Sequence, residues 1–303
     1  MPEIAINLEG QNGLNWPRWK RIVRAVEELG YAALTRSDHY TNPNPPDMDS
    51  LELWVSLTWL ADNTERIEFG PLVSPVSFRH PAMTARMATA VDDLSNGRLL
   101  LGVGAGWQVR EHHNFSYDLL DVPQRMTRFQ EGLEIIHHLL KSDTPLDYPG
   151  QYYQLHEAVI LPRPQRPGGT RLLVGGNGPK RTLPLTARYA DEWNGVFLPA
   201  GRYAELSALL DDLLRAEGRE PSTVRRSLMT GIVFGRTDSE VAERLEGRNR
   251  DELRARGVLV GTADEIADQV AELDAAGVQR LMLQWMDQDD IDGLETLAHR
   301  LIG

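Results

Sequence analysis

The tripeptide Ser37-Asp38-His39 stands at the end of an apolar run and offers proton-transfer chemistry. A histidine beside a carboxylate can donate or accept a proton near neutral pH. The alternative is an ordinary polar turn, and the tripeptide alone fits both. The pairs His112-His113 and His137-His138 are adjacent in sequence, so their members face different sides of a helix, and no H-E-x-x-H occurs. We therefore predict no metal site.

Two glycine-rich segments also follow apolar runs. The first contains Gly104, Ala105 and Gly106, and because position 107 is Trp it is not the G-x-G-x-x-G dinucleotide fingerprint. Glycine lets a flat ring lie close to the backbone, although tight packing inside the fold would select the same residues.

The second glycine-rich segment has the composition of a phosphate-binding loop. Pro179 predicts the start of a helix, with Lys180 and Arg181 directly behind it. Exposed backbone N–H groups, the positive end of a helix dipole and two cations together favour an anion. The alternative is a plain turn between strand and helix. The loop itself consists of Gly175, Gly176, Asn177 and Gly178.

The elements that must position these residues alternate along the whole chain. Amphipathic stretches separate the apolar runs, and Thr237 with Glu240 and Thr262 with Glu265 form capping-box pairs that open two helices. Eight strands are predicted, at residues 4–8, 31–38, 67–75, 98–104, 171–176, 192–198, 227–235 and 278–285.

Eight strands that each precede a helix predict an α/β fold, a (β/α)8 TIM barrel. We expect one domain over residues 1–303, with an insertion around the proline-rich residues 143–170. The rival is a doubly wound open sheet with a second domain. No break in composition divides the chain, which favours the barrel. In a barrel the active site lies at the carboxyl ends of the strands, where the segments above are expected.

Composition limits the possible partners. The chain has 32 Lys+Arg against 44 Asp+Glu and a net charge of −12, which disfavours binding to nucleic acid or to an anionic membrane. It contains no Cys, so disulfides and thiolate chemistry are excluded. The N-terminus lacks the pattern of a secretory signal, and no run reaches the length of a membrane span. We expect a cytoplasmic protein.

With these residues identified, the chain resembles the luciferase-like flavin monooxygenase superfamily, and most of all the branch that uses the deazaflavin coenzyme F420. The resemblance covers nearly the whole chain, and its pieces occur in the order found in the family. They are TRSDHY (35–40), FGPLVSPVSFRHP (69–81), DDLSNGRLLLGVGAGW (92–107), LLVGGNGPKRTLPLTARYADEWN (172–194) and VGTADEIADQV (260–270).

The resemblance implies roles for most of the residues above. Asp38 and His39 match the motif that lies against the deazaflavin and the substrate, and Leu72-Val73 matches a non-prolyl cis peptide behind the central ring. Gly104, Ala105 and Gly106 match the segment beside the ring. Gly175, Gly176, Asn177 and Gly178 match the phosphate loop.

Two departures bear on the substrate. Relatives that oxidise a sugar phosphate carry a catalytic Glu where this chain has Trp107, and they have a Trp shortly after the His, where residues 40–44 here are Tyr-Thr-Asn-Pro-Asn. Both disfavour a sugar phosphate, and Trp107 is expected to form an apolar wall of the substrate site. Glu111, His112 and His113 follow closely, with either mouth-lining or structural roles.

The resemblance implies an F420-dependent oxidoreductase. It would transfer a hydride between the deazaflavin C5 and a small organic substrate, with His39 as the proton donor or acceptor and Asp38 orienting it or contacting the ring. The alternative is an FMN-dependent monooxygenase that uses reduced flavin and O₂, and a further one is a barrel that binds a flavin-type ligand without catalysis. The family commonly forms homodimers, and the apolar positions Leu53, Trp54, Leu57 and Leu60 fit either that contact or packing on the barrel.

Overall fold

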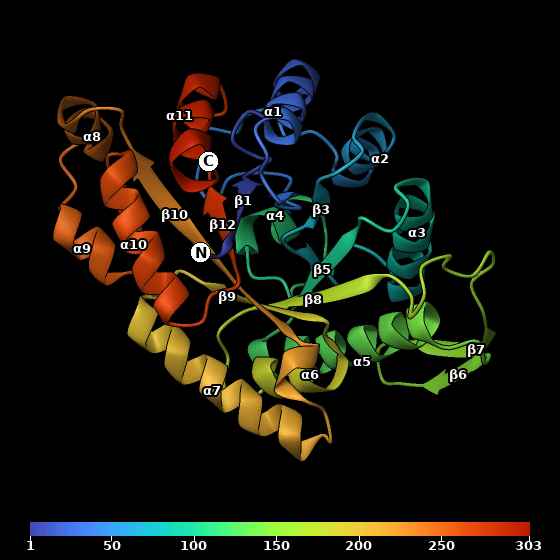
Figure 1. The fold of residues 1–303 in the computed structure, drawn as a ribbon. Coiled ribbons are helices and arrows are strands. Elements are labelled where there is room, and N and C mark those ends of the chain that lie inside the picture. The colour runs from blue at the N-terminus through green and yellow to red at the C-terminus, as the bar shows by residue number, and fades with distance from the viewer.

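Parallel strands follow one another around a barrel in the computed structural model, which describes all 303 residues (Figure 1). The hydrogen-bonded order is β3-β2-β1-β12-β10-β9-β8-β5-β4. Its strands are β1 (Glu3–Leu8), β2 (Ala33–Arg36), β3 (Glu68–Pro71), β4 (Ser74–Pro75), β5 (Leu100–Gly104), β8 (Arg171–Gly175), β9 (Glu192–Val196), β10 (Arg225–Phe234) and β12 (Arg280–Gln284).

The strands β3 and β4 are two pieces of the third barrel strand, interrupted at Leu72 and Val73. Phe69 of β3 pairs with Leu99 just before β5, and Ser74 of β4 pairs with Val103, so both ends of the order meet at β5. Counted this way the barrel has eight strands, which confirms the predicted fold class. The short strand β11 (Leu259–Gly261) adds to the edge of β10 and was not predicted.

Alternation along the strands sorts their side chains between the two faces of the barrel wall. In β1, Ile4, Ile6 and Leu8 belong to the main cluster of 60 buried apolar residues, which packs the wall against the helices. Ala5 belongs to a separate cluster of seven residues drawn from strands all around the barrel. The cavity described below lies at the carboxyl ends of these strands.

The helices surround the barrel (Figure 1). α6 begins at Thr182 and not at the predicted Pro179, because Pro179–Arg181 form a turn and Leu183 N–H reaches back to the carbonyl of Gly178. α4 and α9 were not predicted. The helices are α1 (Trp16–Glu28), α2 (Leu53–Asn63), α3 (Pro81–Leu94), α4 (Val109–Asn114), α5 (Val122–Lys141), α6 (Thr182–Tyr189), α7 (Ala200–Ala216), α8 (Asp238–Leu245), α9 (Arg250–Ala255), α10 (Ala263–Ala275) and α11 (Ile291–Leu301), with a 3-10 turn at Pro221–Thr223.

The predicted insertion contains an antiparallel hairpin, β6 (Leu146–Pro149) and β7 (Gln154–Ala158). It projects beyond α5 at the periphery of the molecule (Figure 1). The carboxylate of Glu131 on α5 accepts hydrogen bonds from three successive backbone N–H groups in the turn, at residues 151–153. This carboxylate anchors the hairpin to α5.

The apolar stripe of α2 faces inward. Leu53, Trp54, Leu57 and Leu60 are all buried within the chain, so they pack on the barrel and do not present a free surface. Val55 is the exposed large apolar side chain of this helix. None of the helices has the length and apolar character needed to cross a membrane.

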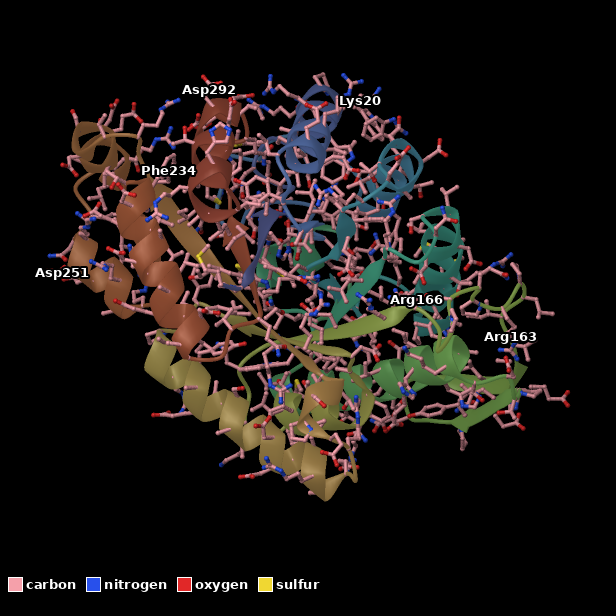
Figure 2. The ribbon with its side chains drawn as sticks, viewed as in Figure 1. Lys20, Arg163, Arg166, Phe234, Asp251 and Asp292 are labelled. Carbon is pink, nitrogen blue, oxygen red and sulfur yellow. The ribbon has the colours of Figure 1, made fainter.

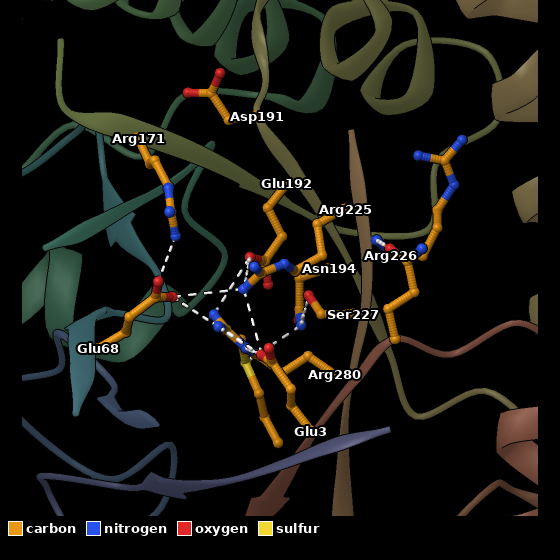
Figure 3. Close-up of polar contacts among 12 residues, drawn as sticks. Glu3, Glu68, Arg171, Asp191, Glu192, Asn194, Arg225, Arg226, Ser227 and Arg280 are labelled. Carbon is orange, nitrogen blue, oxygen red and sulfur yellow. Dashed lines mark hydrogen bonds and ion pairs between the residues drawn. The ribbon is translucent and has the colours of Figure 1, made fainter. Parts of the chain in front are cut away.

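A network of ion pairs closes the amino-terminal end of the barrel (Figure 3). The guanidinium of Arg280, whose side chain is 2% exposed, lies 2.6 Å from Glu68, 2.8 Å from Glu3 and 3.4 Å from Glu192. Burial raises the pKa of Glu192. Burial also acts to raise the pKa of Glu68, but Arg280 and Arg171 outweigh it and the net pKa is lowered. The network plugs the barrel opposite the candidate site.

Candidate active site

A cavity of 620 Å³ opens at the carboxyl ends of the barrel strands, in the size range of small-molecule sites. We call it the mouth cavity. Residues predicted from four different strand ends meet there, although they are far apart in the sequence. Those that line it are His39, Leu72, Val73, Gly104, Ala105, Gly106, Trp107, Gly175 and Gly176.

His39, which follows β2, is held by a carboxylate from α4. Its Nδ1 lies 2.8 Å from Oε1 of Glu111, and the other oxygen of Glu111 accepts the backbone N–H of Tyr40 at 3.0 Å. The side chain of Glu111 is 1% exposed. Burial acts to lower the pKa of His39, but the hydrogen bond and charge of Glu111 outweigh it, so the pKa is raised above its ordinary value of 6.5. The imidazolium form is therefore stabilised at the cavity wall.

Asp38 and His39 have different hydrogen-bond partners. Its carboxylate accepts a hydrogen bond of 2.7 Å from Ser74 Oγ and pairs with the guanidinium of Arg79. It lines a separate cavity of 150 Å³ and not the mouth cavity. Asp38 was expected to orient His39 or to contact the ring. The structure shows that Glu111, and not Asp38, orients His39. The strand-end motif supplies the imidazole, and its carboxylate partner comes from the chain 72 residues later.

The peptide bond between Leu72 and Val73 is cis, which agrees with the expectation from the resemblance. The Val73 side chain projects over neighbouring glycines of β5 and β8. A Cβ added to Gly104 would lie 2.5 Å from Val73 Cγ2, and one added to Gly175 would lie 3.0 Å from Val73 Cγ1. These glycines make room for the bulge at Leu72-Val73. Val73 and these glycines together form one wall of the mouth cavity, which we call the cradle.

The loop after β8 has the donors that a phosphate needs. Gly176, at φ +130°, gives its N–H to the sheet, and the Asn177 side chain bridges to the backbone of Val196 through two hydrogen bonds. Asn177 and Gly178 therefore lie behind the cavity wall rather than on it. No hydrogen bond within the chain uses the backbone N–H groups of residues 177, 178, 180 and 181. These free donors precede the first turn of α6 and fit an anionic group.

Trp107 stands at the rim of the mouth cavity with 59% of its surface exposed. Its ring meets the ring of His39 edge to face, with centroids 5.6 Å apart. Trp107 therefore lines the cavity beside His39, and its contact with a substrate stays a prediction. By contrast, His112 is buried and bonded to Ser77 and to the Gln108 carbonyl, and His113 faces solvent, so neither lines the cavity.

Other residues at the cavity were not predicted as site residues. Glu9, after β1, accepts hydrogen bonds of 2.9 Å from Gln11 and 2.7 Å from Gln284, which ends β12. Asn194 of β9 contributes a buried Oδ1 that has no hydrogen-bond partner. The strand-end rule, applied to the sixth and eighth strands as well, would have found Val196, Phe197, Gln284 and Met286. The added lining residues include Gln11, Asn12, Asn42, Pro43, Val196, Phe197, Met229, Gln284 and Met286.

No three or more His, Asp or Glu side chains gather where they could hold a metal ion. The mouth cavity combines one imidazole, two carboxylates and the cradle, and the loop with the free N–H donors follows directly after its Gly175 and Gly176. That set can position an organic cofactor carrying a planar ring and a phosphate. It can also move a proton at the His39 ring.

Comparison with known proteins agrees with this architecture. 4-Hydroxyprotoasukamycin monooxygenase of Streptomyces nodosus subsp. asukaensis is 27% identical, over 93% of this chain and 84% of that protein. F420-dependent glucose-6-phosphate dehydrogenase of Amycolatopsis mediterranei is 31% identical, over 61% of this chain and 53% of that protein. A phthiodiolone/phenolphthiodiolone dimycocerosates ketoreductase of Mycobacterium bovis is 29% identical, over 81% of this chain and 64% of that protein. The matches therefore span less than two thirds of the last two proteins.

Solved structures share the fold over the full length. An F420-dependent secondary alcohol dehydrogenase, solved with an F420-acetone adduct, superposes with a TM-score of 0.85 at 18% identity and covers 99% of both chains. A monooxygenase from Streptomyces bottropensis gives a TM-score of 0.81 at 20% identity, covering 100% of this chain and 99% of that one. The luciferase-like monooxygenase family matches residues 5–250. With this match and the barrel described above, the chain belongs to the luciferase-like monooxygenase family.

Proposed function

We propose that this protein is an F420-dependent oxidoreductase that transfers a hydride between the deazaflavin C5 and a small organic substrate. The observation that carries the proposal is the His39–Glu111 pair at the wall of a mouth cavity that is also lined by Val73 and the glycines of β5 and β8. F420, when bound, supplies the hydride chemistry, and the protein supplies binding, orientation and protons.

In this proposal the ring and the phosphate of the cofactor each have their own set of residues. The bulge at Leu72-Val73 and residues 104–106 would hold the ring, and residues 175–178 with the free N–H groups behind them would hold the phosphate. Trp107 would cover one side of the substrate and exclude water from the reacting carbon.

His39 would handle the proton. Glu111 occupies Nδ1, and no hydrogen bond within the chain uses Nε2, so the proton moves at Nε2. In reduction, Nε2–H donates to the carbonyl oxygen of the substrate as the carbon accepts the hydride. In oxidation, Nε2 accepts the hydroxyl proton of the alcohol. The Glu111 carboxylate stabilises the charged ring in both directions.

Two comparisons favour a deazaflavin enzyme, since a relative at 31% identity and a structural neighbour both have F420 in their names. A monooxygenase that matches 93% of the chain supports the second candidate, an FMN-dependent monooxygenase. Titration of the apoprotein with F420 and with FMN separates the two. Oxygen consumption with reduced FMN is the corresponding activity assay.

We further propose that the protein acts as a cytoplasmic homodimer on a small-molecule substrate. Support for the dimer comes from Val55 on α2 and Met83 on the adjacent α3, which are 56% and 51% exposed. Light scattering of the purified protein, with Val55→Glu as the variant, tests that contact. A monomeric wild-type protein would contradict the dimer.

A further inference from the structure

The charged side chains of the mouth cavity do not balance. No Lys or Arg is among the residues that line it, and its charged members are His39, Glu9 and Glu111. His39 pairs with Glu111, with 2.8 Å between Nδ1 and Oε1. The groups that donate to the Glu9 carboxylate are neutral amides. Glu9 therefore contributes a negative charge that no cation of the chain compensates.

The cations of the chain lie outside this cavity. Lys20 on α1 and Arg163 in the insertion point outward at the periphery of the molecule (Figure 2). Lys180 and Arg181 are exposed beside the phosphate loop. Positive charge is therefore available to an anion at the loop and not inside the mouth cavity.

Neighbouring amides hold the Glu9 carboxylate in place. It accepts hydrogen bonds of 2.9 Å from Gln11 Nε2, 2.7 Å from Gln284 Nε2 and 3.4 Å from Asn7 Nδ2. The Gln288 side chain donates to the backbone carbonyl of Glu9 at 3.0 Å. A carboxylate offers about four lone-pair positions, so the three amides leave it able to accept from a ligand.

The closed strand order places Glu9 across the mouth from the cradle. Glu9 follows β1 and Gln284 ends β12. In the ring of eight barrel strands, β1 lies opposite β8 and β12 lies opposite β5, and the glycines of the cradle belong to β5 and β8. His39 follows β2, the neighbour of β1. A ring held on the cradle therefore leaves the side of Glu9 and His39 to the substrate.

Glu9 also acts on His39. Burial lowers the pKa of His39, the Glu111 carboxylate raises it, and the charge of Glu9 acts to raise it as well. A cation bound at Glu9 therefore lies near the proposed site of proton transfer.

An acceptor without a donor lies toward the same side of the barrel. The amide nitrogen of Asn194 donates to Ser227 Oγ at 3.0 Å and contacts Met282 of β12. Asn194 Oδ1 is buried and has no hydrogen-bond partner, although Asn194 lines the mouth cavity. A buried acceptor without a donor is costly, so the lining favours an occupant that brings N–H groups.

We propose that Glu9 selects a substrate that carries a protonated amine. The ammonium group donates hydrogen bonds to the Glu9 carboxylate, and the reacting carbon of the same molecule lies between His39 and the cofactor ring. Phosphate esters and carboxylates are excluded, because the cavity holds no Lys or Arg to pair with them. This inference rests on the proposed function and adds the substrate class to it.

The test is isothermal titration of the F420-saturated protein with benzylammonium, benzyl alcohol and benzoate at neutral pH. The three probes share a phenyl ring and differ in the charge of the attached group. We expect benzoate to bind most weakly and benzylammonium to have a Kd about tenfold below that of benzyl alcohol, because hydrogen bonds to charged groups are stronger than those between neutral groups. Glu9→Gln should raise the Kd of benzylammonium about tenfold and leave that of benzyl alcohol within about twofold. Glu295→Gln, which removes the same charge from an exposed site on α11, is the matched control and should keep the wild-type order.

Equal affinities for the three probes in the wild-type protein would overturn the proposal, whether or not the Glu9 variant folds. An ammonium preference of wild-type size in Glu9→Gln, or its loss in both variants, would overturn it as well. The same titrations without cofactor keep the two proposals apart. An ammonium preference in a protein that does not bind F420 contradicts the proposed function alone, and F420 binding with equal probe affinities contradicts the role of Glu9 alone.

Discussion

His39 Nδ1 lies 2.8 Å from Glu111 Oε1, although 72 residues separate the two in sequence. The barrel brings them together, because the loop after β2 and the helix after β5 both open at the same end of the sheet. The carboxylate fixes the ring and leaves Nε2 toward other partners. Most of the chemistry proposed here depends on this pair.

Replacing Glu111 with Gln should move the pH dependence of turnover. The raised pKa of His39 comes from Glu111 against the lowering effect of burial, so without the charge the pKa falls. Ketone reduction requires protonated His39, so its rate is high at low pH and is lost as the pH rises through the pKa of His39. The kinetic pH profile of Glu111→Gln should therefore lose activity at lower pH than the wild type does. His113→Gln, at an exposed neighbouring position, is the control, and an unmoved profile in Glu111→Gln would count against the positioning role.

His39→Asn should separate catalysis from binding. Loss of a general acid costs about 10²-fold or more in kcat, while the cradle and phosphate loop remain intact. We expect the Kd for F420, measured by fluorescence, to stay within about twofold of the wild type. Unchanged kcat would remove His39 from the mechanism.

Gly104→Ala should disturb the cradle. The added Cβ would lie 2.5 Å from Val73 Cγ2, which forces the bulge or β5 to move. We expect a loss of about 1–3 kcal/mol in unfolding free energy and weaker F420 binding. Gly201→Ala is the control, since a Cβ there meets nothing within 4 Å and lies in α7. That variant should be stabilised by up to about 1 kcal/mol in urea unfolding. Equal behaviour of the two variants would argue against the cradle.

Two glutamates of the ion-pair network at the amino-terminal end of the barrel should contribute unequally to the free energy of unfolding. Glu68→Gln leaves the buried Arg280 and the partly exposed Arg171 without the carboxylate they share, and should cost on the order of 3 kcal/mol at neutral pH. Glu192, whose pKa is raised by burial, is nearer to its neutral form, so Glu192→Gln should cost about 1 kcal/mol or less. Urea unfolding of both variants measures the difference, and equal losses would contradict it.

The same network predicts that the free energy of unfolding depends on pH in the acid range. Since the folded-state pKa of Glu68 is lowered, its contribution is present above the unfolded value of 4.5 and is lost as the pH falls through the folded value. Unfolding free energies measured against pH should therefore fall less steeply on the acid side in Glu68→Gln than in the wild type. Parallel curves would show that Glu68 does not carry the effect.

The barrel was predictable because its signal is repeated and local. Each buried parallel strand is an apolar run, as in residues 98–104, and strand and helix alternate along the whole chain. Boundaries were less predictable. The interruption of the third strand at Leu72-Val73 has no marker in composition and came only from the resemblance. The true start of α6 depends on a turn that Pro179 alone does not reveal.

Some residues of the site were also predictable from the sequence, and others were not. His39 and both glycine segments were identified because each stands directly at a strand end. Glu111 as the partner of His39 could not be assigned, because that contact depends on how α4, an unpredicted helix, packs across the mouth. Asp38 was the sequence neighbour and pairs with Arg79 instead. Proximity in the chain is a poor guide to which carboxylate reaches an imidazole.

The central claim is an F420 site at the mouth of the barrel. The most direct measurement is a parallel titration of the purified apoprotein with F420 and with FMN, followed by fluorescence, with Gly176→Val beside the wild type. Gly176 has φ +130°, and an added Cβ would lie 3.3 Å from Thr182 Cγ2, so the variant should distort the phosphate loop. The account predicts tighter binding of F420 than of FMN, and at least about tenfold weaker F420 binding by the variant. Preference for FMN, or equal F420 affinity in the variant, would contradict it.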